Sequence, residues 1–257
     1  YDMAFPTSIG LKPGMEKVET SSQKHKLGTR ATTPDGRVFY YVENSGTAIG
    51  TGGQIVNGKD AVAAHDMDVQ ATAAQSAGDT TISIEVPTTD LTKDQYKDGY
   101  LYFNDGPGQG EIYQIKSHPA HDASADNTVI ITIDEEDGIA TALTTSSLCG
   151  LMYNPYKDID VIDGDGTMGT GPLGVTCAPL TADYFGWIQT AGPCSILIGA
   201  QVAVVGDAIA ISQASGEDGT AERTDYSDEA DIINIGTAMG IPAVATDYQW
   251  AMLNIRY

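Results

Sequence analysis

The sequence predicts a mainly β protein, in which an extended N-terminal arm is followed by two small antiparallel β-barrel or β-sandwich units. Glycine is frequent, at 29 of 257 residues, and it occurs among many Thr, Val and Ile residues, which favour turns and strands. Short apolar segments alternate with polar positions, and no apolar helical stripe exceeds about two turns. We expect an arm over residues 1–36 and β domains over residues 37–163 and 164–257.

The predicted arm has no self-contained core. Residues 1–25 show neither a helical nor a strand period, and their apolar residues are scattered. A segment of this kind is disordered or becomes ordered against something else. We expect the arm to bind a partner through Phe5, Ile9, Leu11, Lys12, Lys24, Lys26, Leu27, Arg30 and Arg37. The alternative is a disordered tail with incidental lysines.

Charge is unevenly distributed along the chain. The net charge is −22, yet residues 1–37 hold six Lys and Arg against four Asp and Glu, which leaves −24 for the remainder. An acidic body repels phosphate backbones, so we expect no binding of nucleic acid. A mildly basic arm on an acidic body indicates contact with a partner on one side and exposure to water on the other.

The predicted strands begin after a tight turn at Pro34-Asp35-Gly36, whose residue types favour a chain reversal. The first domain is expected to contain strands at 37–42, 80–86, 99–104, 111–116, 127–134, 148–153 and 159–162, with a hairpin formed by 99–104 and 111–116. The Gly-rich stretch 163–174 is the predicted domain boundary. Further strands are expected at 175–180, 184–190, 195–198, 201–205, 208–211, 231–236, 243–246 and 250–255.

No group of residues predicts catalysis. The glycines of 106–110 precede a predicted strand, whereas a phosphate-binding loop opens a helix. His118 and His121 are expected in a surface loop, because Pro119 prevents a regular helical pairing of the two rings. No Ser or Cys lies in a sharp strand-to-helix turn. We therefore predict no enzyme activity, no catalytic residue and no cofactor.

An acidic cluster is the weak candidate for a metal site. Its members are Asp158, Asp160, Asp163 and Asp165, and carboxylates at this density could bind Ca²⁺. The EF-hand pattern fails, because Met168 stands where Gly is needed and Gly174 where Glu is needed. We expect a solvated acidic edge rather than a metal site.

Cysteines and aromatic residues leave two alternatives open. Cys149, Cys177 and Cys194 are an odd number and predict buried thiols, with a Cys177–Cys194 disulfide as the alternative. The stretch 184–190 has apolar bulk on both faces, which fits a central core strand or a strand that faces another subunit. Tyr184 and Trp187 are therefore tentative subunit-interface residues.

Residues 1–10 lack the apolar core of a signal peptide, and the apolar run 196–211 is too short and polar to span a membrane.

Several segments resemble a family of small structural proteins of tailed bacteriophages that are encoded near the major capsid protein. The similar segments are LGTRATTPDGRVFYYV, GYLYFNDGPGQGEIYQIKSHP, LMYNPYKDIDV and ADYFGWIQTAGPC, which together cover most of residues 26–198. The resemblance implies a capsid decoration, or cement, protein that is made in the host cytoplasm and binds the outer surface of the virion capsid. It implies the major capsid protein as partner, a homotrimer, and no catalytic residue, nucleic acid or membrane.

Two other functions are considered. A head fibre or a receptor-binding or glycan-binding module would depend on exposed loops such as 212–228 more than on the arm. A secreted hydrolase or carbohydrate-binding sandwich is the third possibility. The major capsid protein itself is disfavoured, because no long amphipathic helix is evident.

Overall fold

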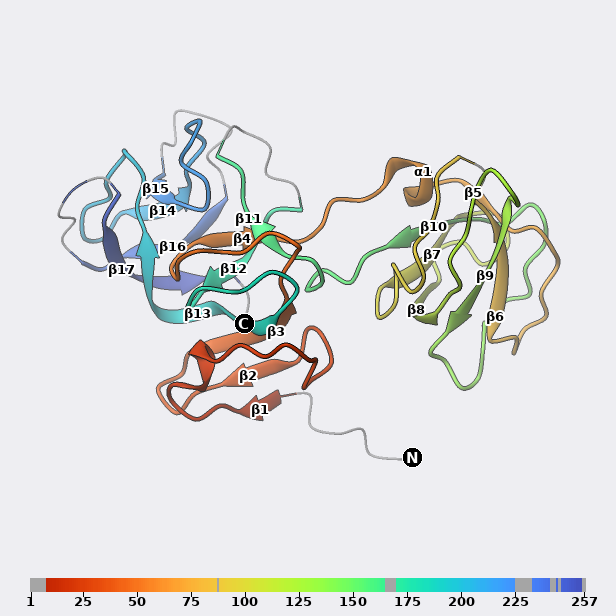
Figure 1. Ribbon diagram of the computed structural model, residues 1–257, viewed down its shortest axis with the longest axis horizontal. Coiled ribbons are helices and arrows are strands. Elements are labelled where there is room, and N and C mark those ends of the chain that lie inside the picture. The colour runs from red at the N-terminus through yellow and green to blue at the C-terminus, as the bar shows by residue number, and fades with distance from the viewer. Residues whose placement is uncertain are drawn as a thin grey trace. The chain divides into compact units, whose positions relative to one another are not determined.

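The computed structural model describes residues 8–86, 88–164, 170–224, 233–240, 244 and 246–255. The chain forms two compact units, both built mainly from β strands (Figure 1). Unit 1 consists of Tyr1–Lys59 and Pro155–Tyr257, and unit 2 consists of Asp60–Asn154. The predicted mainly β class is therefore confirmed.

The domain boundaries differ from the predicted bounds of 37–163 and 164–257. Unit 2 is an insertion into unit 1, because strands on both sides of it pair with one another. Strand β4 (Ile55–Asn57) pairs with β11 (Asp160–Val161) and β12 (Pro172–Thr176), and β3 (Val38–Glu43) pairs with β13 (Phe185–Leu197). A Cβ on Gly58 would lie 2.7 Å from the Pro155 carbonyl oxygen, so the chain leaves and re-enters unit 1 at adjacent points.

Unit 1 is organised around β13, a strand of 13 residues that pairs with β3, β12 and β17 (Tyr248–Asn254). Its remaining elements are β1 (Ser8–Gly10), the 3-10 helix η1 (Met15–Lys17), β2 (Arg30–Thr32), β14 (Ala208–Ile211), β15 (Ala221–Arg223) and β16 (Asn234–Ala238). The main path through the sheet is β1-β2-β3-β13-β17-β16-β14-β15. The β1–β2 pair is parallel and the other strand pairs are antiparallel.

The extended N-terminal arm is not confirmed. Residues 8–36 fold onto unit 1: β1 pairs with β2, and β2 pairs with β3 across the predicted turn. Leu11 belongs to a buried cluster with Ala31, Phe39, Tyr41 and Trp187. These apolar side chains show no sequence period because strands from distant parts of the chain bury them. Residues 1–7 lie outside the described part of the chain.

Unit 2 is a six-stranded antiparallel sheet that closes almost completely into a barrel. It contains the short helix α1 (Ala63–Asp66) and the strands β5 (Val69–Gln70), β6 (Thr81–Glu85), β7 (Tyr100–Asp105), β8 (Ile112–Ser117), β9 (Thr128–Ile133) and β10 (Leu148–Met152). The order is β5-β10-β7-β8-β9-β6. An antiparallel bridge between Ala71 and Ile84 brings the first and last strands together. Barrel closure removes the exposed sheet edges that favour aggregation.

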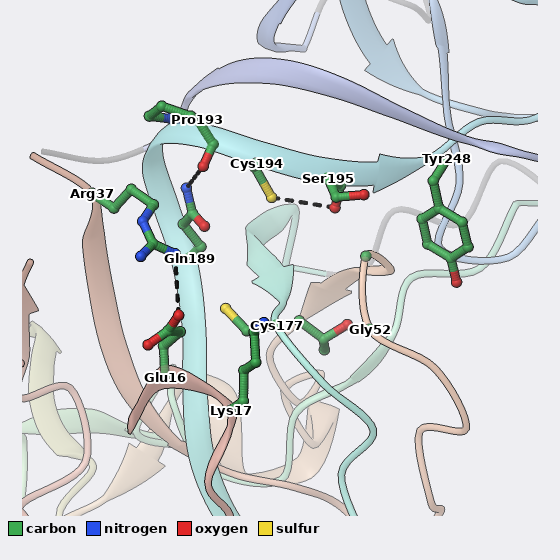
Figure 2. A pocket seen from close by; sticks show the side chains of 12 residues that line it. Glu16, Lys17, Arg37, Gly52, Cys177, Gln189, Pro193, Cys194, Ser195 and Tyr248 are labelled. Carbon is green, nitrogen blue, oxygen red and sulfur yellow. Dashed lines mark hydrogen bonds and ion pairs between the residues drawn. The ribbon is translucent and has the colours of Figure 1, made fainter. Parts of the chain in front are cut away.

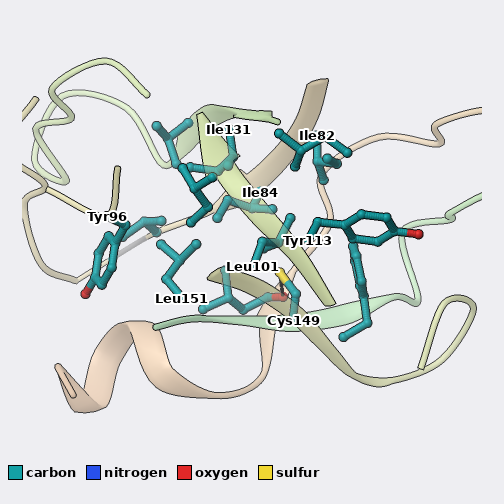
Figure 3. Close-up of a cluster of buried hydrophobic side chains, with 14 of the residues drawn as sticks. Ile82, Ile84, Tyr96, Leu101, Tyr113, Ile131, Cys149 and Leu151 are labelled. Carbon is teal, nitrogen blue, oxygen red and sulfur yellow. Dashed lines mark hydrogen bonds between the residues drawn. The ribbon is translucent and has the colours of Figure 1, made fainter. Parts of the chain in front are cut away.

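The core of unit 2 is its own. Figure 3 shows Ile82, Ile84 and Ile131 packed with Leu101 and Leu151, and all five side chains are fully buried. The alternating residues of 80–86 thus face inward as predicted, and the predicted hairpin forms as β7 and β8.

Several predicted strands differ from the structure. The strands predicted at 184–190 and 195–198 form one strand, β13, and β12 ends at Thr176, so most of 175–180 lies outside it. Of the strand predicted at 243–246, residues 243 and 245 lie outside the described part of the chain, and residues 244 and 246 belong to no strand. Residues 159–162 contribute only β11, which belongs to unit 1 rather than to the sheet of the hairpin. Residues 201–205 form no strand; a turn holds them next to β16, with the Gly206 amide donating to the Ala238 carbonyl at 2.8 Å. Within the described residues, no helix is long and apolar enough to cross a membrane.

Candidate functional site

The candidate site is a cavity of about 480 Å³ on unit 1, next to the bend of β13 (Figure 2). Its volume falls within the range of small-molecule and side-chain binding sites. Residues far apart in the sequence form its wall, because η1, the turn before β3, the end of β12 and the starts of β4 and β17 all approach β13. The cavity has a charged side, a pair of thiols and an aromatic side.

The charged side contains Glu16, Lys17 and Arg37. An ion pair joins Arg37 Nη1 to Glu16 Oε1 at 3.3 Å, and Arg37 Nε also donates to Asp35 at 2.9 Å. Burial alone would raise the pKa of Glu16, but backbone N–H groups at Glu16 and Gly14 and the charge of Arg37 hold it below its usual value. The Arg37 pKa is raised, because its two carboxylate partners outweigh the effect of burial. Two carboxylates thus balance most of the positive charge on this side, and Lys17 is the lining cation for which no carboxylate partner is found among the described residues.

The thiols of Cys177 and Cys194 lie on the wall of the cavity and are free (Figure 2). Burial raises the pKa of Cys194 to about 12 and raises that of Cys177 further, with a contribution from Cys194. Thiols of this kind hold their protons at neutral pH and are poor nucleophiles. The prediction of buried thiols is confirmed for Cys149 and Cys194, and Cys177 is half-buried.

The aromatic side is formed by Tyr248, which packs over Gly53. A Cβ on Gly53 would come within 2.6 Å of the Tyr248 ring, and Gly53 has φ +82°, so this close approach needs glycine. On the opposite side, the Gln189 amide donates to the Pro193 carbonyl at 2.7 Å and to Ala191 at 3.1 Å. The described lining residues contain no activated nucleophile with an adjacent base. The cavity is suited to holding a side chain or small ligand.

The apolar residues predicted to bind a partner face the protein's own core. Leu11 is buried, and Ile9 and Leu27 pack half-buried against the same cluster. Phe5 lies outside the described residues.

The basic residues predicted to bind a partner lie on the surface of unit 1. Lys12, Lys24 and Lys26 are exposed. Arg30 is half-buried and donates to the Ser8 hydroxyl at 3.3 Å, and Arg37 lines the cavity. The structure thus separates the predicted set into buried apolar residues and surface cations.

The tentative interface residues face their own chain. Trp187 is 5% exposed, and its ring centroid lies 5.0 Å from that of Tyr41 and 5.5 Å from that of His25. Tyr184 is half-buried, and its carbonyl accepts the Asn44 amide hydrogen at 2.8 Å. Residues 184–190 were expected either in a central core strand or in a strand that faces another subunit, and in the structure residues 185–190 belong to the central core strand.

The described acidic residues considered for Ca²⁺ do not form a metal-binding group, although Asp160 and Asp163 line one cavity. Asp158 pairs with Lys59 at 3.4 Å, and Asp160 accepts hydrogen bonds from Ser45 and the Val161 amide. Asp163 is exposed and Asp165 lies outside the described residues. Within the described ranges, no three His, Cys, Asp or Glu side chains are placed to hold a metal ion.

The expectation that His118 and His121 lie in a surface loop is wrong, because both side chains are buried in unit 2. The His118 Nε2 atom accepts the Tyr96 amide hydrogen at 3.0 Å, and the His121 ring bonds the Val86 carbonyl at 2.8 Å. His65 is also buried, and its Nδ1 lies 2.8 Å from the Tyr96 hydroxyl. The sequence holds no local signal for this group, since it is assembled from α1 and from segments 86–96 and 118–121, which lie apart in the chain.

Sequence reasoning also missed most of the cavity. Gln189 was expected only as a strand residue and Tyr248 lay between two predicted strands, and their convergence depends on the pairing of β13 with β17. No family model, curated protein or solved structure matches this chain.

Proposed function

We propose that the protein is a non-enzymatic structural protein of a phage virion, which binds the outer surface of the capsid and joins neighbouring capsomers. The observation that carries the proposal is the separation of charge on the folded chain. Unit 2 has three Lys and Arg against sixteen Asp and Glu, a net charge of −13. Residues 8–37 have six Lys and Arg against three Asp and Glu, and they fold onto unit 1.

This charge separation suits a protein in which one unit attaches to a partner and the other stays solvated. Electrostatic complementarity guides association and orients a partner. The strongly acidic remainder keeps many copies soluble at high local density. The resemblance of residues 26–198 to phage structural proteins supports the same function, and the candidate cavity, with its protonated thiols, is suited to binding rather than to covalent catalysis.

The proposal is tested by co-sedimentation of the purified protein with matched phage shells that lack it, before and after expansion. We expect saturable binding to expanded shells. The charge-reversal variant Lys12→Glu/Lys24→Glu/Lys26→Glu should bind more weakly. Its matched control reverses three lysines of unit 2, Lys93, Lys97 and Lys116, and should bind as the wild type does. Absence of wild-type binding to both kinds of shell would count decisively against a decoration role.

A head fibre or glycan-binding module is the second candidate, and one observation favours it. Tyr248 and Trp250 are exposed on the same face of β17. Exposed aromatic side chains that share a face can stack against sugar rings. This alternative assigns binding to the exposed loop 212–228, of which the structure describes residues 212–224. Binding of the wild type to host cells or a glycan array, with loss in Trp250→Thr, would select this function.

A further inference from the structure

The outward face of β17 is apolar although it lies at the surface. Tyr248 is 50% exposed, Trp250 48% and Met252 39%, whereas the alternate residues Ala251 and Leu253 are buried in unit 1. The strand alternation that buries one set of side chains necessarily presents the other set to the outside. The Tyr248 ring packs over Gly53 and the Trp250 ring over Gly240, yet about half of each side chain stays exposed.

The neighbouring strands extend this face without adding charge. On β13, Ser195 lies opposite Trp250 and Pro193 opposite Met252; on β16, Thr237 lies opposite Met252. Directly opposed residues project from the same side of a sheet. The result is an uncharged face, defined here as Pro193, Ser195, Thr237, Tyr248, Trp250 and Met252.

Exposed apolar residues are concentrated in this part of the chain. Of the thirteen large apolar residues that are exposed in the described ranges, eight lie between residues 204 and 252. Exposed apolar patches mark interaction sites, and the centres of protein interfaces are depleted of charge and enriched in Trp, Tyr and Met. The uncharged face has this composition in a protein with a net charge of −22.

The uncharged face is continuous with the candidate cavity. Pro193, Ser195 and Tyr248 belong to both, and Lys17 and Arg37 stand on the far side of the cavity (Figure 2). A partner that covers the aromatic residues can therefore place a neighbouring side chain in the cavity. Lys17, a cation on the cavity wall, favours a carboxylate as that side chain.

We propose that the uncharged face and the cavity are the attachment surface for the shell, and that the bound shell protein presents an apolar cluster next to a carboxylate. This inference rests on the proposed function. Charge complementarity identifies the occupant, because Lys17 and Arg37 line the cavity that adjoins the uncharged face and attract an acidic group of the shell protein. A second copy of this chain is the alternative occupant, and it would bring two chains of charge −22 together at this face.

The test uses shell co-sedimentation with the full chain. Trp250→Thr removes the largest side chain of the uncharged face, and Ser195→Glu places a charge at its centre without deleting a contact. Lys17→Glu replaces a cation on the cavity wall with a carboxylate. The matched controls are Ile130→Thr, an apolar residue of unit 2 that is 53% exposed, and Lys97→Glu, an exposed lysine of unit 2. Thermal unfolding establishes that each variant is folded.

We expect Trp250→Thr and Ser195→Glu each to raise the half-saturation concentration about tenfold or more, as for the central residues of protein interfaces. Lys17→Glu should weaken binding and reduce its dependence on salt, and both controls should bind as the wild type does. If the wild type binds and the face variants bind equally well, this inference is wrong while the proposed function stands. If the wild type binds no shell, both are wrong. If the face variants instead dissociate an oligomer in sedimentation velocity, the face joins copies of this chain and the inference is overturned.

Discussion

Leu11 and Trp187 pack in one buried cluster of unit 1, although one follows the N-terminal strand β1 and the other lies in the central strand β13. The sequence placed Leu11 against a partner of an extended arm, and it left Trp187 either in a core strand or, tentatively, at a subunit interface. In the structure each supplies part of the other's apolar surroundings. The N-terminal residues 8–36 are consequently part of the core of unit 1.

Replacement of Leu11 tests this relationship. Leu11→Ala should lower the free energy of unfolding of unit 1 by about 2–5 kcal/mol, the range for a buried leucine. Lys12→Ala, the exposed neighbour, should change it by no more than about 0.5 kcal/mol. Urea unfolding followed by tryptophan fluorescence reports on unit 1, because both tryptophans lie there. Equal stability of the two variants would show that residues 8–36 fold as a separate arm.

Unit 2 should fold without unit 1. Its core cluster consists entirely of residues from Asp60–Asn154, and its sheet closes on itself through Ala71 and Ile84. We expect the isolated segment 60–154 to unfold cooperatively on heating, and Ile131→Ala to lower its melting temperature. Circular dichroism measures both. A non-cooperative melt would show that the barrel depends on unit 1.

Unit 2 should lose stability as the pH falls below about 6.5, because burial lowers the pKa of His65 and the nearby His121 and His118 lower it further. The unfolded chain then binds more protons than the folded one, so acid favours unfolding. One such group contributes at most about 1.4 kcal/mol per pH unit. The measurement is calorimetry of the full chain from pH 7.5 to 5.5, with the unit 2 transition identified by Ile131→Ala. His65→Gln should reduce the pH dependence, and the exposed His25→Gln should leave it intact.

The three thiols should react slowly in the folded protein. Burial raises the pKa of Cys149 and of Cys194 to about 12, so the reactive thiolate is scarce at pH 8. We expect a thiol-specific disulfide reagent to label fewer than one thiol per folded chain in the time that it needs to label all three thiols of the denatured chain. Rapid labelling of one thiol in the folded protein would contradict this. Detection of a single thiol in non-reducing denaturant would reveal a Cys177–Cys194 disulfide.

Local patterns determined the elements whose partners lie nearby in the chain. The alternation of Ile82 and Ile84 indicated β6, and the turn at Pro34-Asp35-Gly36 indicated the β2–β3 reversal. Both patterns are read correctly because side-chain alternation and turn chemistry act over a few residues. The mainly β class follows from the same short-range information.

The tertiary structure alone decided the domain boundaries, the burial of the supposed arm, the histidine group and the cavity. Each depends on strand pairings between distant residues, such as Val42 of β3 with Gly186 of β13 and Ser195 of β13 with Trp250 of β17. Strand periodicity specifies which residues share a face, but the pairing of strands determines which face meets the core and which stays exposed. Trp187 and Trp250 demonstrate this difference: both lie in correctly predicted strands, and only the folded sheet buries the first and exposes the second.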